Sequence, residues 1–243
     1  MKNILLLGAT GSIGDSVLNV IRQNDSTLNL FGIAVGKNIK KTDGIIKEFL
    51  PKYVFVDDVI AYDDISSSNP DKNILNSDQE LLNLISDDKV DIVISAIVGF
   101  AGLKASLMAV NAGKTVLIAN KESIVAAGDI LMPLARSKGS TIIPIDSEHN
   151  AIFQCLPEDK TTQDVDKIII TASGGPFIDI PLSKLSNISP QDALKHPNWQ
   201  MGSKISIDSA TLVNKCLELI EARYLFDLNE KFFDLVVHPQ SII

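Results

Sequence analysis

Four polar residues near the end of the chain are spaced so that one helix would place them on a single face. They are Thr211, Asn214, Lys215 and Glu218, in a stretch (residues 211–225) without Gly or Pro. At about 100° per residue they project from one side of a continuous helix. Asp208 or Ser209 is the predicted N-cap. An amide, a cation and a carboxylate on one face predict one wall of a polar binding site.

The rest of that helix is apolar around most of its circumference. Its apolar residues are Leu212, Val213, Cys216, Leu217, Leu219, Ile220 and Tyr224. A helix so apolar is usually buried, and a buried Asn, Lys or Glu needs a partner or a ligand. The alternative is the solvated face of a surface helix, with Lys215 and Glu218 as an ordinary i, i+3 ion pair.

A second charged group follows the apolar residues 142–145. Asp146 and Glu148 flank Ser147, so an extended backbone would put both carboxylates on one side, close enough to bind a hard divalent cation. The alternative is an N-cap and the acidic first turn of a helix. Glu218 is the candidate for a third ligand, which would favour the metal site.

Three glycines near the N-terminus form a nucleotide-binding pattern. Gly8, Gly11 and Gly14 follow an apolar strand at residues 3–7 and open a helix, as in a G-x-x-G-x-x-G variant of the dinucleotide fingerprint. Glycines there let the backbone approach a pyrophosphate at a helix N-terminus.

The second strand, residues 30–35, ends in Gly36, Lys37 and Asn38. A site selective for NAD would be expected to place an acid there, so the cation favours the 2′-phosphate of NADP. A solvated Lys in a turn is the alternative.

Strands are predicted at residues 53–56, 91–98, 115–119, 141–145 and 167–171, with helical stretches such as 103–111 between them and surface connections at 66–76 and 157–166. This alternation predicts an α/β fold: a Rossmann-like doubly wound parallel sheet, followed by an incomplete α+β catalytic domain. The expected domains are residues 1–146, binding NADP, and residues 147–243, catalytic and connective. Asn120 to Ser123 and Asp146 to Asn150 follow strand ends, where ligands bind in such sheets.

Ser173 precedes two glycines, and a hydroxyl beside exposed backbone N–H groups suits an anion such as a phosphate ester. A plain turn is the alternative. Together with Ser209, Asn214 and Lys215 it would form a phosphate pocket.

Composition narrows the function classes. A net charge of −8 and a pI near 4.9 argue against a nucleic-acid or anionic-membrane surface as the main partner. The longest apolar runs have the length of a strand and are too short to span a membrane. Cys155 and Cys216 lack metal-type spacing and are expected to be free, packed thiols in a reducing cytoplasm.

Eight motifs, in this order, resemble one enzyme family. They are Gly-Ala-Thr-Gly-Ser-Ile-Gly, Asn-Lys-Glu-Ser, Asp-Ser-Glu-His-Asn-Ala-Ile-Phe-Gln, Ser-Gly-Gly-Pro-Phe, His-Pro-Asn-Trp-x-Met-Gly, Asp-Ser-Ala-Thr, Asn-Lys and His-Pro-Gln-Ser. The chain is similar over essentially its whole length to the 1-deoxy-D-xylulose 5-phosphate reductoisomerase family. Members of that family continue beyond the position of Ile243, so a fragment is expected, prone to self-association.

The resemblance implies an activity in isoprenoid precursor biosynthesis. A metal-dependent rearrangement of 1-deoxy-D-xylulose 5-phosphate, a phosphorylated sugar, would be followed by hydride transfer from NADPH to give 2-C-methyl-D-erythritol 4-phosphate. The cation would be Mn²⁺, Mg²⁺ or Co²⁺. The full-length protein would be a cytoplasmic homodimer, with no nucleic-acid or membrane partner.

The resemblance also implies residue roles. Asp146, Glu148 and Glu218 would hold the metal, and Lys121, Ser147 and Glu148 would touch the hydroxyl and carbonyl region of the substrate. Its phosphate would contact Ser173, His196, Ser209, Asn214 and Lys215. NADPH would contact Thr10, Gly11, Ser12, Ile13, Gly36, Lys37, Asn38, Asn120, Glu122 and Gly202. Trp199 would lie on a loop that closes over the substrate, or, alternatively, pack as a core aromatic.

Two other functions fit the same motifs. One is a different metal-assisted NADP dehydrogenase acting on another phosphorylated substrate, and the other is a nonenzymatic nucleotide-binding regulator.

Overall fold

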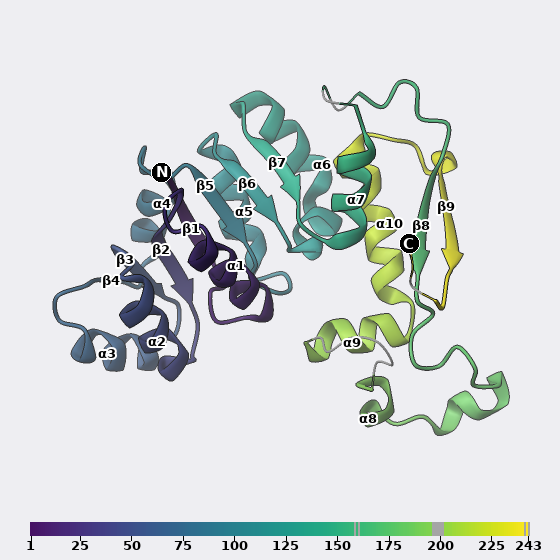
Figure 1. Cartoon of the computed structure of the whole chain (residues 1–243), viewed down its shortest axis with the longest axis horizontal. Coiled ribbons are helices and arrows are strands. Elements are labelled where there is room, and N and C mark those ends of the chain that lie inside the picture. The colour runs from purple at the N-terminus through teal and green to yellow at the C-terminus, as the bar shows by residue number, and fades with distance from the viewer. Residues whose placement is uncertain (158, 160, 196–201, 241, 243) are drawn as a thin grey trace. The chain divides into compact units, whose positions relative to one another are not determined.

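The structure is a computed structural model of residues 1–243, and it describes all of them except residues 158, 160, 196–201, 241 and 243. The predictions for His196 and Trp199 therefore lie outside the described residues. The chain forms two compact units, Met1–Asp146 and Ser147–Ile243 (Figure 1). In the described part of the chain, no helix is long and apolar enough to cross a membrane.

The first unit is built on a seven-stranded parallel sheet in the order β4-β3-β2-β1-β5-β6-β7 (Figure 1). The strands are β1 Lys2–Leu7, β2 Leu28–Val35, β3 Tyr53–Val56, β4 Asn73–Leu75, β5 Ile92–Ser95, β6 Thr115–Ile118 and β7 Thr141–Pro144. The order reverses between β1 and β5, which makes the fold Rossmann-like and doubly wound, as predicted.

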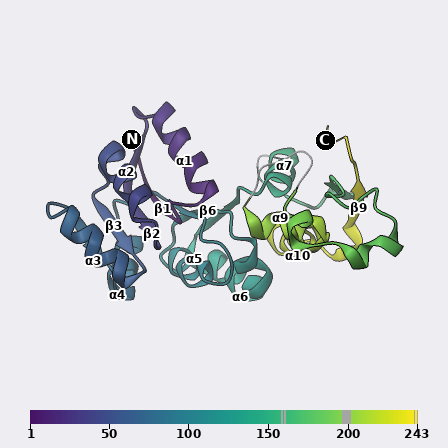
Figure 2. The ribbon, with the colours of Figure 1, turned by 90° about the horizontal axis from the view of Figure 1, so that it is seen from below.

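Six helices cover the two faces of this sheet (Figure 2). They are α1 Ser12–Gln23, α2 Ile39–Phe49, α3 Val59–Ser68, α4 Asp78–Ser86, α5 Gly102–Asn111 and α6 Lys121–Lys138. Alternate residues of β1 face opposite sides, as the pleat requires. Ile4 and Leu6 pack in the cluster that includes α1, α2 and α3, whereas Leu5 and Leu7 pack with α4, α5 and α6.

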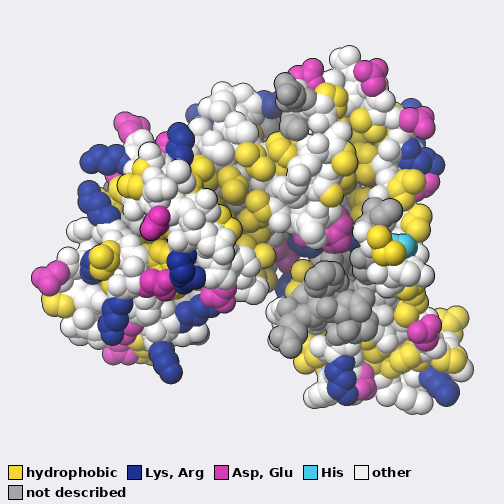
Figure 3. All heavy atoms as spheres, viewed as in Figure 1, with side chains coloured by type: hydrophobic (Ala, Val, Ile, Leu, Met, Phe, Trp, Pro, Cys, Tyr) yellow, Lys and Arg dark blue, Asp and Glu magenta, His cyan; other side chains and the backbone are white. Residues whose placement is uncertain are grey.

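Two sequence predictions in this unit are wrong. Residues 66–76, expected to be a surface connection, contain the end of α3 and the short edge strand β4. The strand predicted over residues 91–98 ends at Ser95, because the chain leaves the sheet there and Val98 is exposed. Acidic and basic side chains are interspersed over the face of this unit drawn in Figure 3.

The second unit contains a two-stranded parallel sheet and several helices (Figure 1). Its elements are α7 Ser147–Cys155, β8 Ile168–Ala172, η1 Leu182–Asn187, α8 Pro190–Ala193, α9 Ser203–Ala210, α10 Val213–Phe226, η2 Glu230–Phe232 and β9 Phe233–Val237. Its core joins β8 and β9 to α10 through residues such as Ile170, Phe233, Ala222 and Phe226.

The single helix predicted from Thr211 onward is wrong. Leu212 adopts a left-handed conformation (φ 61°) that separates α9 from α10, and the Thr211 hydroxyl donates to the carbonyl of Ile207 in the preceding helix. Asp208 and Ser209 therefore lie in the last turn of α9 and do not cap the next helix.

The prediction that polar side chains of this helix are buried and paired is confirmed for Lys215 and Glu218, and the alternative of a solvated polar face is wrong. The inward side of α10 buries these charged groups together with Ala222 and Phe226 of the core. Not all of the apolar residues are covered, since Val213 and Ile220 are more than 40% exposed. Cys155 and Cys216 are free, as predicted, but both are exposed rather than packed.

Stability should be sensitive to Gly14 and insensitive to Gly44. A Cβ on Gly14 would lie 2.3 Å from the carbonyl oxygen of Ala9, while one on Gly44 in α2 would meet nothing within 4 Å. We expect Gly14→Ala to lower the free energy of unfolding by about 1–3 kcal/mol. The control Gly44→Ala should raise it by about 0.5–1 kcal/mol. Urea unfolding followed by circular dichroism measures both, and equal effects would contradict the packing argument.

Candidate functional site

The glycine-rich turn lies at the carboxyl end of β1, and its backbone is packed tightly. Gly8 has φ 89°, and a Cβ there would lie 2.6 Å from the carbonyl oxygen of Ala96, which follows β5. The chain then enters α1, with Gly11 as its N-cap. Of the predicted cofactor residues, Gly11, Ser12 and Ile13 are exposed and Thr10 is half-buried, so the N-terminus of α1 is accessible to an anion.

The segment after β2 carries three lysines, Lys37, Lys40 and Lys41, of which the sequence analysis identified only Lys37 as a candidate site residue. Lys37 is 86% exposed, and its ammonium lies 3.8 Å from a carboxylate oxygen of Asp58. The Asn38 side chain caps α2 by accepting from the backbone N–H of Lys41 at 3.2 Å.

Lys41 is the cation that sequence reasoning missed. Its ammonium donates to the carbonyl of Thr10 at 2.9 Å and to Asp15 at 2.7 Å. It therefore ties the first turn of α2 to the glycine-rich turn. Its spacing of four residues from Lys37 was the only available signal.

Asn120 acts as a structural connector after β6. It is 2% exposed, its amide NH₂ donates to the carbonyls of Ile97 and Gly99, and its amide oxygen accepts from the N–H of Ser123 at 2.6 Å. The side chain thus joins the loop after β5 to the N-terminus of α6. Glu122 is half-buried in the first turn of the same helix.

Lys121 and Asp146 form an ion pair across the carboxyl ends of the neighbouring strands β6 and β7. The ammonium and carboxylate are 2.7 Å apart, with only 8% and 16% of the side chains exposed. A pair so shielded from water is held more firmly than a surface ion pair. The sequence predicted both residues as site members, and the structure pairs them.

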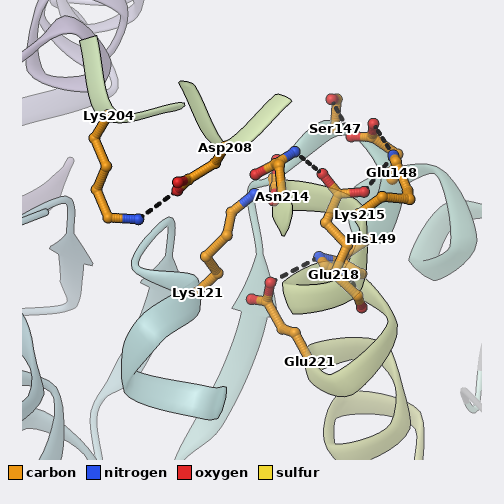
Figure 4. Close-up of polar contacts among 11 residues, drawn as sticks. Lys121, Ser147, Glu148, His149, Lys204, Asp208, Asn214, Lys215, Glu218 and Glu221 are labelled. Carbon is orange, nitrogen blue, oxygen red and sulfur yellow. Dashed lines mark hydrogen bonds and ion pairs between the residues drawn. The ribbon is translucent and has the colours of Figure 1, made fainter. Parts of the chain in front are cut away.

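In the second unit, the residues predicted from α7 and α10 meet around one ammonium group (Figure 4). The Nζ of Lys215 lies 2.8 Å from Oε1 of Glu148 and also donates to Oε2 of Glu218. Asn214 donates to the other carboxylate oxygen of Glu218, and the Ser147 hydroxyl donates to Glu148 at 2.6 Å.

The electrostatics of this cluster favour the charged form of Glu148. The side chains of Lys215 and Glu218 are 6% and 1% exposed, and that of Glu148 is 28% exposed. Burial raises the pKa of the Glu148 carboxyl, but the Lys215 ammonium, together with hydrogen bonds from Lys215 and Ser147, outweighs burial and lowers this pKa below its ordinary value. Glu148 is therefore ionised at neutral pH.

The backbone of this segment is helical rather than extended. Ser147 and Glu148 lie in the first turn of α7, so the prediction of an extended Asp-Ser-Glu segment is wrong. The alternative, a helix with an acidic first turn, is what the structure shows. Glu148 reaches Glu218 from one helix to another, because both carboxylates accept from Lys215.

A second link between α7 and α10 joins His149 to Glu221, and Glu221 is a residue that the sequence analysis did not identify. His149 is fully buried; its Nε2 lies 2.9 Å from the main-chain carbonyl of Glu218, and its Nδ1 lies 3.2 Å from a carboxylate oxygen of Glu221. Glu221 is also fully buried. Its position three residues after Glu218, on the same helical face, was the signal that could have found it.

The Ser173 turn packs against the end of α9. Gly174 and Gly175 have positive φ values, the N–H of Gly175 donates to the Ser173 hydroxyl at 3.3 Å, and a Cβ on Gly175 would lie 2.9 Å from the carbonyl oxygen of Ser209. The turn that follows Ser173 therefore packs against the backbone of Ser209. Gly202 is the exposed N-cap of α9, and Asn214 and Lys215 contact the carboxylates described above.

The fold and these clusters define a class. A Rossmann-like unit with an accessible helix N-terminus at the end of β1 is followed in the chain by a unit in which two carboxylates converge on one cation. This combination is that of a dinucleotide-binding protein with a candidate divalent-metal site.

The family follows from comparison with known proteins. Residues 4–128 match the family described as 1-deoxy-D-xylulose 5-phosphate reductoisomerase, and residues 142–226 match its C-terminal domain. The chain belongs to the 1-deoxy-D-xylulose 5-phosphate reductoisomerase family. The family resemblance seen in the sequence motifs is confirmed.

Curated relatives are similar along the whole chain. The 1-deoxy-D-xylulose 5-phosphate reductoisomerases of Acinetobacter baylyi and of Francisella tularensis subsp. novicida are each 47% identical to it, over 100% and 99% of this chain. The chain spans 64% and 63% of the length of these two relatives.

Solved structures of the family share the fold. One, of DOX-P reductoisomerase in complex with NADPH, fosmidomycin and magnesium, is 44% identical with a TM-score of 0.94, covering 99% of this chain and 62% of that one. Another, the Zymomonas mobilis enzyme in complex with NADPH, is 40% identical with a TM-score of 0.90, covering 100% and 62%.

The pairing of His149 with Glu221 predicts a large stability effect. In His149→Phe the Glu221 carboxylate stays buried without the imidazole, so we expect the free energy of unfolding to fall by about 3–5 kcal/mol. Adding Glu221→Leu should recover part of that loss, because the double variant buries no carboxylate at this position. Urea unfolding of the two single variants and the double variant measures the coupling; additive losses would show that the two side chains do not interact.

Proposed function

We propose that the protein to which this chain belongs converts 1-deoxy-D-xylulose 5-phosphate to 2-C-methyl-D-erythritol 4-phosphate, using NADPH and a divalent cation. The observation that carries the proposal is the convergence of Glu148 and Glu218 on one cation. Glu148 lies two residues after Asp146, the last residue of the first unit. A relative with the same fold binds NADPH, fosmidomycin and magnesium. In this proposal residues 1–146 bind the cofactor and residues 147–243 belong to the catalytic part.

Asp146, Glu148 and Glu218 would hold the metal. Their fit is supported by the chemistry of the donor set: hard carboxylate oxygens suit Mg²⁺ and Mn²⁺, and each of the three carboxylates already lies beside an ammonium, Lys121 for Asp146 and Lys215 for the two glutamates. When bound, a divalent cation polarises substrate oxygens and stabilises the negative charge that develops during carbon–carbon rearrangement.

The remaining polar residues of the chain would bind and orient the substrate. Lys121, already shielded from water beside Asp146, would stabilise charge or move a proton at a substrate oxygen. Ser147 would hydrogen-bond the same region. The phosphate would be held by Ser173, His196, Ser209, Asn214 and Lys215; Gly175, in the turn that follows Ser173, packs against the backbone of Ser209.

NADPH would lie along the carboxyl edge of the sheet. The exposed N-terminus of α1, from Thr10 to Ile13, would take the pyrophosphate, and Gly36, Lys37 and Asn38 the 2′-phosphate. Asn120, Glu122 and Gly202 complete the proposed cofactor contacts. The hydrogen bonds of the Asn120 side chain support a role in fixing the loop after β5 beside the cofactor.

Three further features are proposed for the whole protein. The free, exposed cysteines support a reducing cytoplasmic location. Manganese is proposed alongside magnesium because the same ligands suit both. The exposed apolar residues of β9, Leu235, Val236 and Val237, support association into a homodimer.

The activity is tested with the full-length protein. NADPH oxidation should require both 1-deoxy-D-xylulose 5-phosphate and Mn²⁺ or Mg²⁺, and Glu218→Gln should abolish Mn²⁺ binding at nearly constant side-chain shape while leaving the circular dichroism spectrum intact. Calorimetric titration measures the binding. Oxidation that proceeds with other sugar phosphates instead, or Mn²⁺ affinity unchanged by Glu218→Gln, would contradict the proposal.

Cofactor choice is tested at Lys37. A charge-assisted hydrogen bond to the 2′-phosphate should favour NADPH over NADH by about 1–3 kcal/mol, and Lys37→Glu should remove that preference. Lys40→Glu, which alters an exposed lysine of α2 by the same charge, is the matched control. Dissociation constants for both nucleotides, measured with each variant, decide the matter: an unchanged ratio in Lys37→Glu would refute the role.

A further inference from the structure

Lys215 stands between the two carboxylates of the second unit that were assigned to the metal. Its Nζ is 2.8 Å from Oε1 of Glu148, donates to Oε2 of Glu218, and is part of a side chain only 6% exposed (Figure 4). The ammonium therefore bridges two carboxylates from different helices and offsets part of their negative charge. In its absence they would repel each other across a poorly solvated space.

A divalent cation and this ammonium need the same oxygen atoms. Carboxylate oxygens bind Mg²⁺ or Ca²⁺ at about 2.0–2.6 Å, so an ion held by Glu148 and Glu218 together requires the space between them. That space borders the Lys215 nitrogen, and two cations at such a separation repel strongly in a shielded site.

We propose that Lys215 is an internal cation that a divalent metal displaces, so that metal binding releases the Lys215 ammonium to hold an anion. This inference rests on the proposed function, because the metal ligands are those named above. Lysine suits the exchange, since its ammonium is a point charge on a flexible four-carbon stem and does not bind carboxylates in a fixed fork as arginine does.

Asn214 takes part in the same exchange. Its amide donates to the second carboxylate oxygen of Glu218, so both polar side chains of the first turn of α10 are occupied by the carboxylate cluster. Metal binding to Glu218 competes with both donors. An anion such as the substrate phosphate then meets one cation and one amide that the carboxylates no longer hold.

The exchange makes metal and phosphate binding interdependent. A ligand that frees Lys215 raises the affinity of the site for an anion, and linkage requires the anion to raise the affinity for the metal by the same factor. While the two carboxylates hold the Lys215 ammonium, it is not available to an anion, and phosphate is bound weakly. Metal would therefore bind before, or together with, the phosphorylated ligand.

The experiment is Mn²⁺ titration of the full-length protein and its Lys215→Met variant, followed by calorimetry or by the electron paramagnetic resonance of free Mn²⁺. Removing the competing cation should tighten Mn²⁺ binding by about 5–150-fold, the usual range of coupling between sites. Lys204→Met, which removes an ammonium paired with Asp208 at 2.6 Å, is the matched control and should leave the affinity unchanged.

A second measurement uses inorganic phosphate. In the parent chain Mn²⁺ should raise phosphate affinity, and in Lys215→Met that increase should disappear. Lys215→Gln repeats both measurements should the Met variant fail to fold. Mn²⁺ affinity that stays constant or falls in a folded, neutral Lys215 variant overturns the exchange; if Glu218→Gln also binds Mn²⁺ as tightly as the parent does, the proposed metal site is wrong as well.

Discussion

The second unit depends on providing partners for the carboxylates that its own fold buries. Glu218 and Glu221 lie one helical turn apart on the inward side of α10, and Glu148 faces the same region from α7. Each is matched by a group on the facing or the same helix: Lys215 for Glu148 and Glu218, and His149 for Glu221. Uncompensated burial of such groups costs several kcal/mol, so these pairings fix how α7 and α10 pack.

This requirement explains why the hydrophobic pattern alone did not give the orientation of α10. Apolar periodicity assumes that the helix is oriented by hydrophobic burial. Here Val213 and Ile220 face outward, because the inward side buries paired charged groups as well as the apolar Ala222 and Phe226. The break at Leu212 was equally invisible, since a non-glycine residue with positive φ leaves no mark in the sequence.

The first unit was far more predictable, for a physical reason. Its strands are continuous apolar runs bounded by glycines and polar residues, and alternate residues of β1 divide between two cores as period-2 geometry requires. The strand β3 lies where it was predicted, at Tyr53–Val56. Lys41 and Asn120 show the limit: the sequence marks their chemistry, but their hydrogen bonds to Thr10, Ile97 and Gly99 depend on tertiary contacts.

Contacts at the carboxyl edge of the sheet link the ends of β1, β5, β6 and β7. Gly8 packs on the carbonyl of Ala96, and Asn120 donates to the carbonyls of Ile97 and Gly99 in the same loop. The next residue, Lys121, is paired with Asp146. Loops ordinarily allow their residues to wander by more than the strands they join. Asp146 lies just beyond a strand end, but these contacts hold it in place as a residue of the sheet is held. The same contacts hold the turn at Gly8.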